Sequence, residues 1–349
     1  MSLRSNPHPE ASLVAASPSI RRRRGLAGRG LIGLGLVGAV ALLASCGDDG
    51  AGGERTTSTV LVDDKPLIVV TYSILGDVVS QLVGDAATVQ VIIPNGQDPH
   101  DYAPSAQDVE AMRGAALVVS NGLDLEEGME DALTSLEEDD IPVFHASDHV
   151  TLRELSEEEQ AIDEAAHSDE GHSDEHGHGG EDPHLWADPL VMQEMAPALA
   201  AQLEQVLGVS LDEQLAAVEA EMAELDAEVR EIMSVVPSGE CRLVTGHESL
   251  GYFADRYGCE LIGAVIPSLS STAEASAKDL AALLDAAAGT GVAAIFTEVG
   301  TPSDVAEQVA SEVGVPLIEL PSHSLPATGG YQAFIIELAT KVAAGLTGA

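Results

Sequence analysis

The stretch "SLDEQLAAVEAEMAELDAEVREIMSVVP", Ser210 to Pro237, has the periodicity of one long helix. Its apolar side chains recur at steps of three and four, which places them on one helix face. They are Leu211, Leu215, Val218, Met222, Leu225, Val229 and Ile232. Ser210 and Glu213 have the spacing of a capping box, and Pro237 ends the pattern. At 1.5 Å per residue, this helix would be ~40 Å long, about the width of a domain.

Short strand patterns alternate with helical patterns on both sides of this helix. The four strand patterns before it are PLIVV, TVQVIIP, ALVVSNG and IPVFHAS. The four after it are CRLVTG, CELIGAVIP, VAAIFTEVG and VPLIELP. Strands that alternate with helices indicate parallel sheets. The predicted fold is therefore α/β, with two lobes that each contain a roughly four-stranded parallel sheet and that are joined by the long helix. A cleft between two lobes is a common place for a ligand.

The domain boundaries follow from these patterns. We expect an N-terminal lobe at residues 66–209, a linking helix at 210–236 and a C-terminal lobe at 237–349. Within the first lobe, residues 156–181 form a polar, acidic and histidine-rich loop without apolar periodicity,.

The N-terminus has the features of a lipoprotein signal peptide. A cluster of arginines precedes a short apolar run that ends in LASC, Leu43 to Cys46,. This run is shorter than the ~20 apolar residues of a membrane span. LASC resembles the lipobox of bacterial lipoproteins, which implies removal of residues 1–45 and a lipid on Cys46. Residues 46–65 would then be a flexible tether, and we expect an extracytoplasmic protein that is anchored to the cell membrane by its lipid.

Four histidines stand at corresponding places in the two lobes. His100 follows the second strand pattern, and His184 ends the polar loop. His247 follows the first strand pattern of the C-terminal lobe, and His323 follows the last. Open α/β sheets place ligands at the carboxyl ends of their strands. Asp-Pro-His occurs twice, at His100 and His184, and proline restricts the backbone before each imidazole,.

Four imidazoles from two lobes are suited to a tetrahedral metal site. Zinc accepts nitrogen ligands readily, at about 2.0–2.1 Å. Manganese prefers carboxylates. The alternative at this point is four ordinary buried or surface histidines, each with a hydrogen-bond partner.

Three motifs carry a resemblance to a known family. The sequences DPHDYAPSAQDV, DPHLWADP and TGHESLGYFADRYG resemble motifs of the metal-binding solute-binding proteins of ABC transporters, the zinc/manganese (ZnuA-like) type. The resemblance covers roughly residues 66–345. It implies a metal buried between two lobes, with His100, His184 and His247 as ligands. It further implies a lipid-anchored, non-catalytic protein that captures Zn²⁺, or alternatively Mn²⁺, and delivers it to a membrane permease and its ATPase.

The fourth ligand position departs from the family pattern, which often has an aspartate or an open position there. This chain has His323, which we expect to be the fourth ligand. Glu298, in FTEVG, is expected either to support a ligand histidine or to replace one as a ligand.

The remaining histidines of the acidic loop have a different context. His167, His172, His176 and His178 lie among Gly, Ser, Asp and Glu. Two interpretations stay open, a weak accessory collector of zinc and a solvated loop without an essential role. His145 and His149, near the end of the first sheet, are expected to be ordinary histidines.

Charge and cysteines limit the remaining function classes. The formal net charge is −43 at pH 7, and nucleic-acid binding is excluded because phosphate contacts need Lys and Arg. We expect a monomer.

Cys241 and Cys259 begin strand patterns of the C-terminal lobe, and export permits a disulfide between them,. Two buried thiols are the alternative.

Two other functions compete with metal delivery. An exported zinc hydrolase would need an open coordination position and a general base, for which Glu248 or Glu298 are candidates. HESLG, however, lacks the second histidine of H-E-x-x-H,. An exported zinc buffer or chaperone would bind zinc through the histidine-rich loop, so the loop would set its affinity.

Overall fold

The computed structural model describes most of the chain after residue 60. The described residues are 61–62, 64–155, 159, 181–299 and 303–348. All of them belong to one compact unit, Arg55–Ala349. The predicted signal peptide and Cys46 lie outside the described residues. So do the accessory loop histidines, which are His167, His172, His176 and His178. In the described part of the chain, no helix has both the length and the apolar composition of a membrane span.

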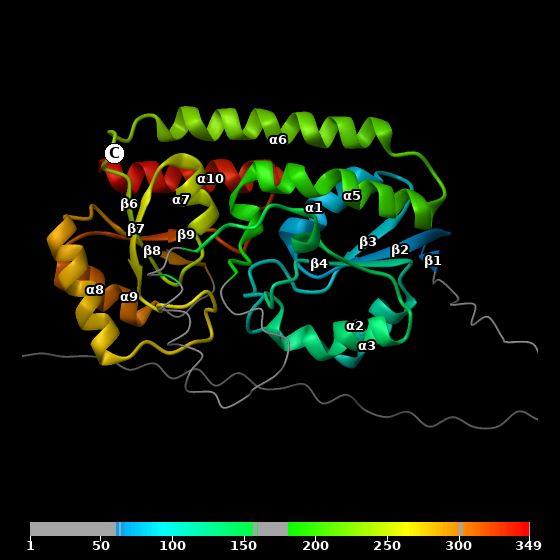
Figure 1. The fold of residues 1–349 in the computed structure, drawn as a ribbon, viewed down its shortest axis with the longest axis horizontal. Coiled ribbons are helices and arrows are strands. Elements are labelled where there is room, and N and C mark those ends of the chain that lie inside the picture. The colour runs from blue at the N-terminus through cyan, green and yellow to red at the C-terminus, as the bar shows by residue number, and fades with distance from the viewer. Residues whose placement is uncertain (1–60, 63, 156–158, 160–180, 300–302, 349) are drawn as a thin grey trace, which may run out of the picture. The chain divides into compact units, whose positions relative to one another are not determined.

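The first lobe contains the predicted parallel sheet (Figure 1). Its strands run in the order β3 (Thr88–Val91), β2 (Lys65–Val70), β4 (Leu117–Ser120) and β5 (Val143–His145), all parallel. Leu67 to Val70 are buried, as expected of a strand covered on both faces,. A two-residue strand, β1 (Leu61–Val62), pairs antiparallel with the start of β2. It lies inside the segment predicted as a tether.

Helices cover both faces of this sheet. On one side lie α1 (Ser73–Val83) and α5 (Pro189–Leu207), and on the other α2 (Ala106–Gly114) and α3 (Glu130–Glu138) (Figure 1). Short 3₁₀ turns complete the lobe, at η1 (Glu127–Met129), η2 (Ala146–His149) and η3 (Leu185–Ala187).

The second lobe contains all four predicted strands, arranged in two parallel pairs. β6 (Arg242–Thr245) pairs with β7 (Glu260–Ala264), and β8 (Ile295–Glu298) pairs with β9 (Leu317–Leu320). β6 and β8 are neighbours, but they form no ladder in the described residues. The helices of this lobe are α7 (Gly251–Tyr257), α8 (Ala277–Thr290), α9 (Asp304–Val313) and α10 (Gly330–Thr347).

A disulfide joins the segments that lead into β6 and β7. Cys241 and Cys259 have sulfurs 1.95 Å apart and Cα atoms 4.6 Å apart. Of the two alternatives for these cysteines, the structure therefore contains the disulfide.

The long helix is present as α6 (Asp212–Met233). The apolar face predicted from Leu211 to Ile232 lies in the main hydrophobic core. The predicted capping box is wrong, because Leu211 is the N-cap and no side chain caps the helix. The Ser210 hydroxyl instead donates to the Asp212 carboxylate at 2.9 Å.

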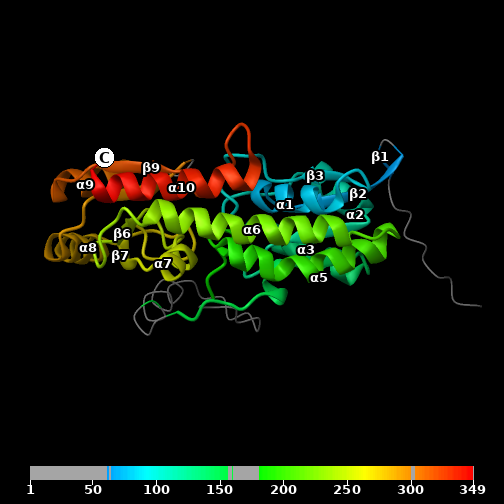
Figure 2. The same cartoon turned by 90° about the horizontal axis from the view of Figure 1, so that it is seen from above.

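The two lobes share one hydrophobic core. It contains residues of β2, β4, β6 and β8 together with the apolar face of α6. α6 lies against α5, α1 and α10, and both views show α6 and α10 side by side (Figures 1 and 2). A smaller core lies between α8, α9 and the strands next to them.

The C-terminal helix is a second connection between the lobes. At its start, the Tyr331 backbone N–H donates to the Asp77 carboxylate of α1 at 2.9 Å, and the Tyr331 hydroxyl donates to the Trp186 carbonyl at 2.9 Å. At its other end, Gly345 faces Ile318 and Phe296 so closely that a Cβ would lie 2.4 Å from Ile318 Cδ1. α10 therefore holds the first lobe and the β8–β9 pair together.

We expect opposite effects from two glycine-to-alanine changes near helix ends. Gly345→Ala in α10 should destabilise the protein by about 1–3 kcal/mol, because the new methyl group has no space,. Gly289→Ala in α8 should stabilise it by up to about 1 kcal/mol, because nothing lies within 4 Å and alanine is the better helix former,. Urea unfolding of both variants checks this, and equal effects would contradict the packing of α10.

Candidate metal centre

The four histidines predicted as metal ligands lie together in the structure. His100 follows β3, His184 directly precedes η3, His247 follows β6 and His323 follows β9. All four are buried, with at most 4% of the residue exposed. One nitrogen from each lies within 4.8 Å of the nitrogens of the other three.

The distances within this group suit one small cation. His184 Nε2 lies 3.4 Å from His100 Nε2 and 3.1 Å from His247 Nε2. Four nitrogens at about 2.0–2.1 Å from a zinc ion would stand about 3.3 Å from one another at the corners of a tetrahedron. Both nitrogens of His323 are buried without a hydrogen-bond partner among the described residues. A buried imidazole without a partner is costly unless something binds its lone pair.

Both Asp-Pro-His motifs form the same turn. The Asp98 carboxylate accepts a hydrogen bond from the His100 backbone N–H at 3.0 Å, and the Asp182 carboxylate accepts one from the His184 backbone N–H at 3.0 Å. Aspartate side chains commonly bond the backbone two residues ahead. Proline restricts the residue between, so each motif fixes the backbone that carries its histidine.

Carboxylates lie behind three of the four rings. Asp182 Oδ1 is 2.8 Å from His184 Nδ1. Glu127 Oε1 is 3.4 Å from His100 Nδ1, and Glu298 Oε1 is 3.4 Å from His247 Nδ1. A carboxylate behind Nδ1 favours a proton on that atom and leaves Nε2 free to bind a metal.

Burial and neighbouring charges set the protonation of the group. Burial and the adjacent imidazoles hold the pKa of His184 well below 6.5. Burial lowers the pKa of His323 to about 4, against the opposing charge of Asp98. Burial also opposes protonation of His247, but Glu298 outweighs it and the pKa of His247 is raised. Neutral His184 and His323 have lone pairs available at neutral pH.

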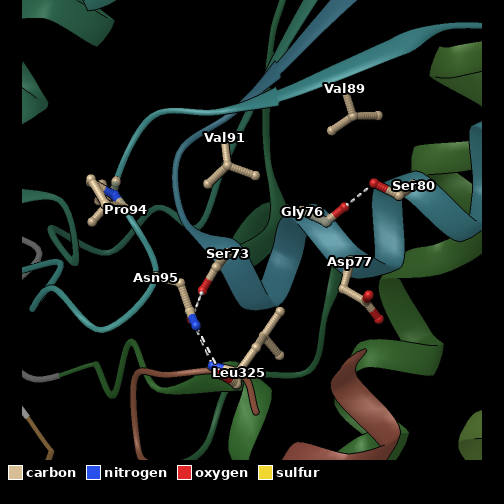
Figure 3. A pocket seen from close by; sticks show the side chains of 10 residues that line it. Ser73, Gly76, Asp77, Ser80, Val89, Val91, Pro94, Asn95 and Leu325 are labelled. Carbon is tan, nitrogen blue, oxygen red and sulfur yellow. Dashed lines mark hydrogen bonds between the residues drawn. The ribbon is translucent and has the colours of Figure 1, made fainter. Parts of the chain in front are cut away.

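The loop that carries His323 is fastened to the first lobe. The Asn95 side chain accepts from the Leu325 backbone N–H at 2.7 Å and donates to the Leu325 carbonyl at 2.8 Å. Figure 3 shows this contact beside a hollow between α1 and the end of β3, with Ser73 donating to Asn95 at 3.0 Å. On the other side of the loop, Trp186 Nε1 donates to the Ser322 carbonyl at 2.7 Å. His323 is therefore held from two directions.

Hydroxyl groups of the second lobe reach the carboxylates beside His100. Ser271 donates to Asp98 at 2.6 Å, and Thr272 donates to Glu127 at 3.2 Å. The nearby histidines and these hydroxyls outweigh burial, so the pKa values of Asp98 and Glu127 are lowered. Both carboxylates therefore stay charged next to the histidine group.

Of the other candidate residues, Glu298 lies beside the histidine group, whereas His145 and His149 lie outside it. Glu298 is buried behind His247 and accepts from Ser249 at 2.9 Å, a place that suits support of a ligand. His145 contacts Ser120 and Glu137, and His149 stacks on Phe144 with ring centres 4.5 Å apart. Neither histidine belongs to the group of four.

The residues that hold the histidines in place are not among the predicted site residues. Asp98 and Asp182 had a signal, because both stand two residues before a histidine in a repeated motif. Glu127 and Asn95 had none, since their contacts join positions that only the folded chain brings together.

Comparisons with known proteins agree with this architecture. Residues 68–345 match the family described as "Zinc-uptake complex component A periplasmic". The chain is 30% identical over 280 residues to the high-affinity zinc uptake system protein ZnuA of Bacillus subtilis, covering 78% of this chain and 82% of that protein. It is 28% identical over 271 residues to the manganese ABC transporter substrate-binding lipoprotein PsaA of Streptococcus pneumoniae, covering 75% and 81%.

A solved structure supports the fold. The periplasmic zinc-binding protein TroA from Treponema pallidum superimposes with a TM-score of 0.68 at 26% identity, over 81% of this chain and 99% of that one. The two-lobed α/β fold and the family resemblance predicted from the sequence are both confirmed.

The low pKa of His323 predicts a pH dependence of stability. Between its folded pKa of about 4 and the usual 6.5, the unfolded chain binds a proton at this position that the folded chain does not,. Stability is therefore lost as the pH falls from 6.5 towards 4. With a chelator present, the unfolding free energy of the natural chain should decrease between pH 7 and pH 5. In the variant His323→Gln this decrease should be smaller by about 2 kcal/mol. Denaturant unfolding at both pH values measures this, and parallel losses would contradict it.

Proposed function

We propose that this chain, which belongs to the zinc-uptake component A family of metal-binding proteins in ABC metal uptake, captures Zn²⁺ outside the cytoplasm. It would deliver the ion to an ABC importer. The family consists of substrate-binding proteins and not of enzymes, so the ion is cargo. The prediction of a non-catalytic protein agrees with this membership.

One observation carries the proposal, the convergence of four buried imidazoles on a single point. His100, His184, His247 and His323 would be the ligands, two contributed by each lobe. Four nitrogen ligands fill a tetrahedral zinc site and leave no position for a reacting water. This arrangement suits binding and release of the ion without chemistry.

The ligand chemistry favours zinc over manganese. The relatives include a zinc-uptake protein and a manganese-transporter protein, so the family by itself leaves both metals open. Manganese prefers oxygen ligands, whereas imidazole suits zinc. Three carboxylates of the surroundings, Asp182, Glu127 and Glu298, face the Nδ1 atoms behind the rings. We therefore propose zinc as the ion of this all-imidazole site.

The proposal includes the surroundings of the protein. Cys46 would carry the lipid that anchors the chain to the membrane, as in relatives named lipoproteins. The partners would be the permease and the ATPase of the importer. A formal net charge of −43 would raise the concentration of divalent cations near the surface,.

The first test separates a cleft site from a buffer that depends on the histidine-rich loop. Residues 47–349, with and without residues 167–180, should each bind one zinc ion tightly in a chelator competition, because the four buried histidines remain. Loss of tight binding on deletion would favour the buffer.

Within the intact chain, His100→Ala and His247→Ala should each weaken binding by more than about 100-fold. His149→Ala, a histidine outside the group, is the matched control and should bind as the natural chain does.

A second test addresses the choice of metal. His323→Asp replaces a nitrogen ligand by an oxygen ligand, so the ratio of zinc affinity to manganese affinity should fall by about tenfold or more. His149→Asp adds the same charge away from the site and should leave the ratio unchanged. Competition titrations with both metals give the ratio, and an unchanged ratio in His323→Asp would show that His323 is no ligand.

A further inference from the structure

Arg153 lies behind the histidine group and contacts three carboxylates. Its side chain is only 7% exposed. Nε donates to Asp255 at 2.8 Å and Nη2 donates to Glu159 at 2.6 Å, while Nη1 lies 3.5 Å from Asp182 Oδ2. The Arg153 backbone N–H also donates to the Tyr252 hydroxyl of α7 at 3.1 Å. Arginine suits this place because its planar guanidinium has several donors in fixed directions.

The two oxygens of Asp182 have different partners. Oδ1 accepts from the His184 backbone N–H and lies 2.8 Å from His184 Nδ1, whereas Oδ2 faces Arg153. Asp182 is completely buried, and Arg153 is the one lysine or arginine that contacts it among the described residues. Contact of Oδ2 with the guanidinium fixes the rotation of the carboxylate, and this rotation aims Oδ1 at the histidine ring.

The fold keeps space for this pair. A Cβ on Gly251, at the start of α7, would lie 2.2 Å from Asp182 Oδ2 and 2.7 Å from Arg153 Nη1. The glycine has no left-handed backbone that would otherwise require it. The absence of a side chain at this position therefore lets α7 of the second lobe approach the Asp182–Arg153 pair.

His184 is also the best oriented of the four histidines. Its Nδ1 is 2.8 Å from a carboxylate oxygen, whereas the corresponding distances for His100 and His247 are 3.4 Å. Its Nε2 lies within 3.4 Å of the Nε2 atoms of both His100 and His247. The ring that is held most firmly is thus the one in the middle of the group.

We propose that Arg153 is a positioning residue of the metal centre, which sets zinc affinity by holding Asp182 against the His184 ring. The inference rests on the proposed function, because it takes His184 as a ligand. Arg153 also links Glu159, which belongs to the predicted acidic loop 156–181, and Asp182, which directly follows that loop, to Asp255 of α7. One guanidinium therefore ties a first-lobe ligand to the second lobe.

The test compares Arg153 with Arg256, because both line one surface hollow beside Tyr252 and Asp188. Arg153→Gln removes the contact with Asp182, and Arg153→Lys keeps the charge but cannot reach three carboxylates at once. Arg256→Lys is the matched control, because Arg256 Nε donates to Asp188 at 2.6 Å and makes no contact with Asp182 or a histidine of the group among the described interactions. Zinc affinity is measured by chelator competition at one fixed pH, and unfolding by urea.

We expect about tenfold weaker zinc binding in Arg153→Gln and a smaller loss in Arg153→Lys, within the range for residues that orient a metal ligand. Arg256→Lys should bind zinc within twofold of the natural chain, even where its stability falls. Affinity within twofold of the natural chain in both Arg153 variants would overturn the proposal. Equal losses in Arg153→Gln and Arg256→Lys would overturn it as well, because they would show a general structural effect.

Two further measurements cover the case in which Arg153→Gln does not fold. Gly251→Ala keeps every charge but displaces the Asp182 carboxylate, so its zinc affinity should also fall. An unchanged affinity counts against the proposal.

The second measurement uses chelator-treated protein with ¹⁵N-labelled histidine. The nitrogen shifts of His184 should show a proton held on Nδ1, and Arg153→Lys should alter these shifts while Arg256→Lys does not. Unaltered shifts would contradict the proposal. This readout needs no zinc, so absence of zinc binding by the natural chain would overturn the proposed function alone.

Discussion

The structure depends on the burial of four imidazoles at one point. Removing polar rings from water without hydrogen-bond partners costs free energy, and His323 has no partner for either nitrogen among the described residues. Such a group persists only where the surrounding fold fixes each ring and where a ligand can use the lone pairs. The depressed pKa values of His184 and His323 follow from the same burial.

The fold meets this constraint by sharing one core between the lobes. Two histidines come from loops of each lobe, so their distances depend on how the lobes are held. α6 and α10 both lie along the shared core, and α10 begins against Asp77 of the first lobe. Smaller contacts act next to the histidines, where Asn95 holds the His323 loop and Ser271 bonds Asp98. Rigid supports of this kind would reduce the reorganisation needed for the proposed binding of a metal.

Charge around the group is arranged in layers. Imidazole rings lie at the centre, and carboxylates lie behind three of them at Asp182, Glu127 and Glu298. In the proposed metal centre these anions would favour a cation held by the rings, and each also favours the ring tautomer that offers Nε2. Arg153 then compensates part of the buried negative charge at Asp182. If a carboxylate replaced one of the rings as a ligand, the negative charge would lie on the ligand itself and no longer behind it.

The sequence predicts the elements and the ligand candidates because both depend on local patterns. The apolar period from Leu211 to Ile232 predicts α6, and the histidines at matching loops of both lobes predict a shared site between the lobes. The supporting contacts lie beyond such patterns. Arg153 reaches Asp255 across 102 positions of the chain, and its place beside Asp182 requires that α7 carry glycine at position 251. These contacts depend on how two helices and a loop meet, which is a property of the folded chain. Periodicity identifies which side chains face inward, whereas the distance between two inward-facing groups depends on every element packed between them.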